Sequence, residues 1–153
     1  ASHDTAELVR RFSLEVRILA KLTHPFIAQL YDAGFTEEGW PYLIMEYVDG
    51  QPIDEYCRLH NLRRSEKLNL IENVIDAVQF AHSHLIVHRD IKPSNVLVGS
   101  DGQPKLLDFG IAKLLEDESD DATRLRAMTP QFASPEQLLD QPSSSASDIY
   151  QLG

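Results

Sequence analysis

Two short segments of the sequence carry residues that could take part in one reaction. The first reads His88-Arg89-Asp90-Ile91-Lys92-Pro93-Ser94-Asn95, and Asp108-Phe109-Gly110 begins thirteen residues after Asn95. Together they offer a carboxylate to orient an attacking hydroxyl, an ammonium group for a moving phosphoryl group, and a carboxamide and a second carboxylate as oxygen ligands for Mg²⁺. Phosphoryl transfer from a nucleotide requires this set of groups.

Each of these residues alone also has an ordinary structural interpretation. Asp90 could lie in a turn, Lys92 on the surface and Asn95 in a loop. Their joint occurrence at this spacing, flanked by β-prone runs, favours a catalytic site over chance.

The order H-R-D-x-x-x-x-N followed by D-F-G is typical of protein kinases. On these motifs the chain resembles eukaryotic-type protein kinases, in particular the serine/threonine kinases of that type found in bacteria. The resemblance implies that Asp90 orients the substrate hydroxyl and accepts its proton, that Lys92 reaches the transferring phosphoryl group, and that Asn95 and Asp108 bind Mg²⁺. It also implies ATP and Mg²⁺ as cofactors and a protein with a serine or threonine acceptor as the substrate.

The resemblance assigns regulatory roles to three further residues. Arg89 directly precedes Asp90, and kinases with this arginine are commonly activated when a phosphate on the activation segment, here 108–136, pairs with it. Thr123 follows an acidic stretch and is a candidate for that phosphate, with Ser119 inside the stretch as the alternative. Thr129 is expected to pack against Asp90 and Lys92 and to mark serine/threonine specificity; the alternative is an ordinary turn threonine before a proline.

The elements that must position these groups begin with a helix predicted over Thr5–Leu22. Its apolar face is formed by Leu8, Phe12, Leu19 and Leu22. Glu15 occupies the remaining position in that stripe, where it could lie in water at the edge or be buried against a cation. The resemblance favours a role in the nucleotide site, because kinases pair a glutamate on helix C with a strand lysine. No lysine precedes Glu15.

Two β-prone runs, Phe26–Tyr31 and Tyr42–Val48, predict a hairpin, with turn residues at 32–34 and 37–39. A buried strand that ends in a turn would explain Glu46 and Val48 equally well without the later motifs. In the kinase interpretation these two residues belong to the hinge, whose backbone would hydrogen-bond adenine.

A long helix is predicted over Ser65–His84, with Ser65 as its N-cap. Its main apolar face is expected to comprise Leu68, Ile71, Ile75 and Val78, widened by Leu70, Val74, Ala77 and Ala81. Two histidines near its end, His82 and His84, are expected at the surface. A second hairpin joins Val96–Val98 to Lys105–Leu107 through a glycine-rich turn.

The resemblance also implies packing roles outside the catalytic residues. His88 and Phe109 are expected to stack in an apolar column with Leu19 and Leu30. Asp148 is expected to stabilise the backbone of the segment that contains Asp90.

These elements imply an α+β fold of the bilobal protein-kinase type. The expected parts are a partial small lobe at 1–45, with helix C and a β hairpin, a hinge at 46–50, and a partial, mostly helical large lobe at 51–153. The resemblance covers the middle of a kinase domain, because the seven glycines form no G-x-G-x-x-G loop and no strand lysine precedes helix C. We therefore expect these 153 residues alone to transfer phosphate poorly or not at all.

Composition narrows the class of protein. The formal net charge is −10, which argues against binding to nucleic acid or to anionic membrane surfaces. No apolar run approaches the roughly 18 residues of a membrane span. The single cysteine, Cys57, fits a reducing compartment, so we expect a cytoplasmic location and no membrane contact from this segment.

Two other functions remain open. A pseudokinase-type binding module would use the fold without catalysis, but the presence of Asp90, Lys92, Asn95 and Asp108 counts against it. A small-molecule phosphotransferase could share part of the motif, but Lys92 and the peptide-platform segment 129–136 favour a protein substrate.

Overall fold

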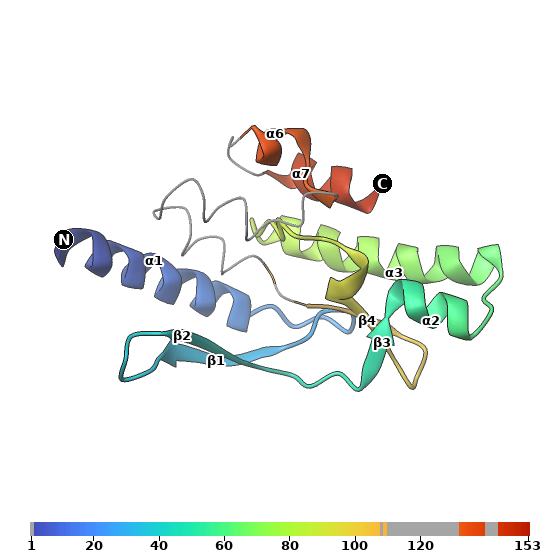
Figure 1. Ribbon diagram of the computed structural model, residues 1–153, viewed down its shortest axis with the longest axis horizontal. Helices are drawn as coiled ribbons and strands as arrows, with labels where there is room; N and C mark the ends of the chain where they lie inside the picture. The colour runs from blue at the N-terminus through green and yellow to red at the C-terminus, as the bar shows by residue number, and fades with distance from the viewer. Residues whose placement is uncertain (1, 108, 110–131, 140–143) are drawn as a thin grey trace.

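The computed structural model of the chain describes residues 2–107, 109, 132–139 and 144–153. Helix α1 (Ser2–Ala20) lies beside a hairpin of β1 (Leu30–Phe35) and β2 (Pro41–Met45) at one end of the molecule (Figure 1). Helices α2 (Ile53–Leu59) and α3 (Arg64–Ser83) lie toward the other end, with α6 (Pro135–Leu138) and α7 (Ser145–Leu152) above α3 in that view. This α+β arrangement agrees with the predicted fold class.

Helix α1 packs on the first hairpin through an apolar cluster. Its core comprises Phe12, Leu19, Leu22, Leu30, Ala81 and Ile86. The rings of Phe12 and Phe35 tie the helix to β1 with their centroids 5.0 Å apart. The predicted helix is thus confirmed, although α1 begins at Ser2 and ends at Ala20, and Phe12, Leu19 and Leu22 of its predicted apolar face are buried.

The first hairpin is confirmed, but its first strand was placed too early. β1 begins at Leu30, opposite Met45, and residues 32–34 lie within the strand instead of forming a turn. The turn lies farther on, where the Thr36 N–H donates to the carbonyl of Trp40 at 2.8 Å. Residues 26–28 pair with the second sheet instead: the Leu106 N–H donates to the carbonyl of Phe26 at 2.8 Å.

A second sheet adjoins the segment that contains Asp90. It contains β3 (Gly50–Pro52), β4 (Val96–Gly99) and β5 (Pro104–Leu106) in the antiparallel order β3-β4-β5. The β4–β5 hairpin confirms the second predicted hairpin, and Gly102 supplies the positive φ of 75° in its turn. Glycine is also required at Gly50, because a Cβ there would collide with the carbonyl of Val98.

The long helix is confirmed, but its cap and its buried face differ from the prediction. The N-cap of α3 is Arg63, whose N–H donates to the Glu66 carboxylate at 2.7 Å. The buried residues are Leu70, Val74, Ala77, Val78 and Ala81. Three of the four residues predicted for the main face are exposed: Leu68, Ile71 and Ile75. The cause is a cluster in which Leu70, Val74 and Val78 pack with the β4 residues Val96 and Val98, which rotates the helix.

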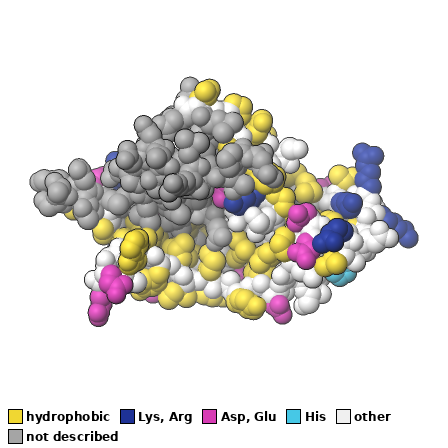
Figure 2. Space-filling view, viewed as in Figure 1, with side chains coloured by type: hydrophobic (Ala, Val, Ile, Leu, Met, Phe, Trp, Pro, Cys, Tyr) yellow, Lys and Arg dark blue, Asp and Glu magenta, His cyan; other side chains and the backbone are white. Residues whose placement is uncertain are grey.

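Charge is unevenly distributed over the surface. Lys and Arg side chains gather at the end of the molecule where α2 and α3 meet (Figure 2). The exposed basic residues of α2 and of the start of α3 are Arg58, Arg63, Arg64 and Lys67. None of the helices in the described part of the chain has the length and apolar character that a membrane crossing requires.

Candidate active site

Residues 88–95, the candidate catalytic loop, connect α3 to β4. It ends in a short 3₁₀ turn, η1 (Pro93–Asn95). Within it Arg89 has a φ of 76°, in the left-handed region that disfavours residues with a Cβ. Such a conformation costs about 1–3 kcal/mol and persists only when surrounding contacts enforce it.

Asp148 on α7 supplies the first of these contacts. Its carboxylate accepts hydrogen bonds from the backbone N–H groups of His88 and Arg89, each at 2.7 Å. His82 Nε2 lies 2.7 Å from Asp148 Oδ2. Asp148 is fully buried, so these charge-assisted bonds compensate the desolvation of its carboxylate. The predicted role of Asp148 is confirmed, whereas the surface position predicted for His82 is wrong, because its ring is half-buried against this carboxylate.

Gln151, also on α7, is a residue that sequence reasoning missed. Its Oε1 accepts a hydrogen bond from the Ile91 N–H at 2.8 Å, and its Nε2 donates to the carbonyl of Arg89 at 3.2 Å. The available signal was spacing: Gln151 follows Asp148 by three positions, so both side chains leave the same face of one helix.

The structure brings together three of the predicted site residues. Lys92 Nζ lies 3.5 Å from Asp90 Oδ2. Asn95 Nδ2 donates to the backbone carbonyl of Asp90 at 2.8 Å and to its Oδ2 at 3.3 Å. A carboxylate, an ammonium and a carboxamide therefore converge on one point, and both side chains of the ion pair remain partly accessible to solvent.

His88 is a structural residue of the loop. Its Nδ1 accepts from the Asp90 N–H at 3.1 Å, which assigns the ring proton to Nε2, where it donates to the carbonyl of Leu107 at 2.6 Å. The ring lies 4.7 Å from the ring of Phe109, centroid to centroid. Phe109 in turn packs against the cluster that contains Leu19 and Leu30, as the predicted column requires.

Glu46, in the segment 46–50 predicted as the hinge, has its own set of contacts. The Glu46 carboxylate accepts from Lys105 Nζ at 2.9 Å and from the Gln29 N–H at 3.0 Å, and the Glu46 N–H donates to the Gln29 carbonyl at 2.8 Å. The hydrogen bond from Lys105, followed by that from Gln29, lowers the pKa of Glu46. Val48 is half-buried two residues farther on. Sequence reasoning missed Gln29 and Lys105.

Glu15 projects from α1 with a half-buried side chain. Burial raises the pKa of Glu15, and the positive charge of Arg89 partly counteracts that rise. The cation that acts on this carboxylate therefore comes from the catalytic loop and stands directly beside Asp90.

Three predicted site residues, Asp108, Thr123 and Thr129, lie outside the described residues. Phe109, next to Asp108, is described and touches both apolar clusters of the molecule.

Glu136 lies in the first turn of α6. In the structure its carboxylate accepts a hydrogen bond from the buried Ser147 hydroxyl of α7, and this bond is the main cause that lowers the pKa of Glu136. Helix α6 is thereby linked to the helix that carries Asp148 and Gln151.

Comparison with known proteins agrees with the geometry. The family model for the protein kinase domain matches residues 1–153. The chain is 40% identical over 152 residues to the serine/threonine-protein kinase PknA of Mycobacterium tuberculosis, covering 96% of this chain and 35% of PknA. It is 39% identical over 148 residues to the serine/threonine-protein kinase PrkC of Bacillus subtilis, covering 96% of this chain and 23% of PrkC. The chain thus spans about a third or less of the length of these curated relatives.

Proposed function

The chain belongs to the protein kinase domain family, and from this premise we propose that it provides the catalytic loop of an enzyme that transfers the γ-phosphoryl group of ATP to a serine or threonine hydroxyl of a protein. The observation that carries the proposal is the convergence of Lys92 and Asn95 on the carboxylate of Asp90.

In the proposed reaction the acceptor oxygen forms a bond to the γ-phosphorus while the bond from that phosphorus to the bridging oxygen breaks and ADP leaves. Asp90 orients the hydroxyl and takes its proton late, because the transition state is loose and positioning matters more than basicity. Lys92 lies close enough to Asp90 to offset the charge of the phosphoryl group that moves past both side chains.

ATP and Mg²⁺ are the cofactors of this family's chemistry, and the donor set fits them. Asn95 uses its amide nitrogen for both bonds to Asp90, so its carbonyl oxygen is the atom suited to Mg²⁺. We assign the second ligand to Asp108. Bound Mg²⁺ would neutralise charge on the nucleotide phosphates.

The remaining assignments use the division of the chain expected from its sequence: a small lobe (1–45), a hinge (46–50) and a large lobe (51–153). The backbone of Glu46 and Val48 would bind adenine, and Glu15 would support the phosphate side of the nucleotide site. Arg89 would pair with a phosphate carried by the activation segment, and Thr123 is the candidate for the residue that carries it. Thr129 would select serine or threonine acceptors. A cytoplasmic location, with neither nucleic acid nor membrane as a partner of this segment, fits the acidic charge and the single cysteine.

The test uses the complete natural protein that contains this chain. It measures phosphate transfer from γ-labelled ATP to the protein itself and to a generic acceptor protein. The substitution Asp90→Asn is expected to lower kcat by about 10²- to 10⁴-fold, because it removes the proton acceptor. The matched control is Asp101→Asn in the exposed β4–β5 turn, which keeps an oxygen for the Gln103 N–H. Equal transfer by the wild type and the Asp90→Asn variant would contradict the proposal, and a folded wild type without transfer would favour the binding module.

A further inference from the structure

We propose that Gln151 is a positioning residue for Asp90, and that it acts by fixing the two peptide groups that flank this residue. The inference rests on the proposed function, since it assigns to Gln151 a role in the same reaction. Gln151 itself need not contact the substrate.

The contacts of Gln151 lie on both sides of Asp90. The Arg89 carbonyl belongs to the peptide group that precedes the Cα of Asp90, and the Ile91 N–H belongs to the one that follows it. One carboxamide hydrogen-bonds to both, at 3.2 Å and 2.8 Å. The orientation of the carboxamide is unambiguous, because a carbonyl can only accept and an N–H can only donate.

Fixing these two peptide planes determines where the Asp90 side chain points. The angle between the planes is set by φ and ψ of Asp90, and the direction of the Cα–Cβ bond follows from them. A carboxylate that must orient a hydroxyl gains from this restraint, because a shift of about 1 Å at a reacting group can cost about 100-fold in rate.

Asp148 does not perform this task. It binds the N–H groups of His88 and Arg89, both before Asp90, and so maintains the entry to the loop and the left-handed Arg89. Gln151 is the α7 residue whose side chain reaches past Asp90 to Ile91, which is itself buried. Asp148 therefore fixes the backbone that precedes Asp90, and Gln151 fixes the peptide groups on either side of it.

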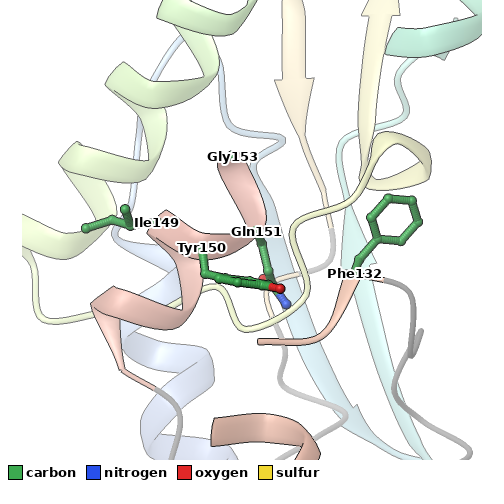
Figure 3. Close-up of a pocket in the computed structure, with 5 residues that line it drawn as sticks. All are labelled: Phe132, Ile149, Tyr150, Gln151 and Gly153. Carbon is green, nitrogen blue, oxygen red and sulfur yellow. The ribbon is translucent and has the colours of Figure 1, made fainter. Parts of the chain in front are cut away.

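The surroundings of Gln151 permit a conservative test. Gln151 lines a pocket of about 500 Å³ together with Phe132, Ile149, Tyr150 and Gly153 (Figure 3). Methionine has the length of glutamine but forms neither hydrogen bond, so Gln151→Met removes the restraint without requiring much new space. The matched control is Gln79→Met at an exposed position of α3.

The experiment measures kcat and the KM for ATP of the full-length protein, with and without Gln151→Met, in the wild-type and Asp90→Asn backgrounds. With Asp90 present, kcat should fall about 10- to 100-fold while KM changes little, because the hydroxyl is misoriented but nucleotide contacts persist. In the Asp90→Asn background the same substitution should cause no further loss, since the group it positions is already disabled. Gln79→Met should leave kcat unchanged.

Two outcomes would overturn the proposal: an unchanged kcat for a folded Gln151→Met protein, or an equal fold-loss in both backgrounds, which would indicate a general structural role. If Gln151→Met abolishes cooperative thermal unfolding, Gln151→Glu replaces it, because glutamate still accepts from Ile91 but cannot donate to Arg89. A folded Gln151→Glu variant must then lose kcat in the Asp90 background only. Failure of the proposed function is recognised separately, because the wild type would then transfer no more phosphate than the Asp90→Asn variant.

Discussion

The candidate catalytic loop (88–95) and the proposed hinge (46–50) are both bound by side chains from distant parts of the chain, but the contacts differ in kind. The loop is bound to α7 through Asp148, which is fully buried, and through Gln151; the hydrogen bonds of these two side chains to the loop end on backbone groups. The hinge is bound to β5 through an ion pair, Glu46 with Lys105, in which each side chain is about a quarter exposed.

The difference determines how each region should respond to change. Removing a buried acceptor leaves N–H groups without a partner, at about 1–3 kcal/mol for each group. A solvent-accessible ion pair contributes about 0–1 kcal/mol and is screened by salt. The geometry around Asp90 is therefore expected to be insensitive to salt concentration. The contact at the proposed hinge is expected to weaken as the salt concentration rises.

The largest effect is expected at the buried end of this comparison. Asp148→Ala removes the acceptor of two backbone N–H groups and the partner of His82, and should lower the free energy of unfolding by about 3–5 kcal/mol. Urea unfolding monitored by circular dichroism measures the change. Asp54→Ala, at an exposed position of α2, is the control. A loss below about 1 kcal/mol would show that the loop does not depend on Asp148.

A smaller effect is expected at the hinge. Lys105→Met should cost about 0.5–1 kcal/mol at low salt, and less at 1 M NaCl, because the pair with Glu46 is partly exposed. The pKa of Glu46 is lowered in the folded state, so its contribution is present above its ordinary value and is lost as the pH falls through the lowered one. The difference between wild type and variant should therefore shrink in acid.

Urea unfolding across salt and pH measures this difference, with Lys67→Met on the exposed side of α3 as the control. A loss of unfolding free energy that does not depend on salt would show that the contact between Glu46 and Lys105 behaves like the buried contacts of Asp148. The proposed difference between the two regions would then be wrong.

The smallest effect, and one of opposite sign, is expected at Glu15. Burial raises its pKa, so the stability linked to its proton is present at low pH and is lost as the pH rises through the folded-state value. Glu15→Gln cannot ionise and should be modestly more stable than the wild type at pH 7 and equal to it near pH 3. Thermal unfolding at both pH values measures this, and Glu72→Gln at an exposed position of α3 serves as the control. A less stable variant at pH 7 would indicate that Arg89 outweighs burial.

Prediction from the sequence succeeded where the signal was local. Helical periodicity identified α1 and α3, and the glycine-rich turn identified the β4–β5 hairpin. It failed where a distant partner decided the outcome. Residues 26–28 are β-prone, but they pair with Leu106 and not with β2. Helix α3 is apolar on several sides, and only the packing of β4 determines which side is buried.

The candidate site shows the same division. Asp90, Lys92 and Asn95 were predicted because they are close in sequence and match a motif. Gln151 and Lys105 were missed, since glutamine and lysine carry no distinctive spacing and their partners lie 59 to 62 residues away. Asp148 was predicted only through the resemblance to kinases.

The attachment of the catalytic loop to α7 has a consequence for synthesis on the ribosome. His88 and Asp148 are 60 residues apart, so the loop leaves the exit tunnel well before the helix that shapes it. Closing a loop of this length must precede any gain from the contact. A nascent chain that already displays Asp90 and Lys92 therefore has these groups without their final orientation. We therefore expect the orientation proposed for these groups to form only after α7 has been translated and has docked.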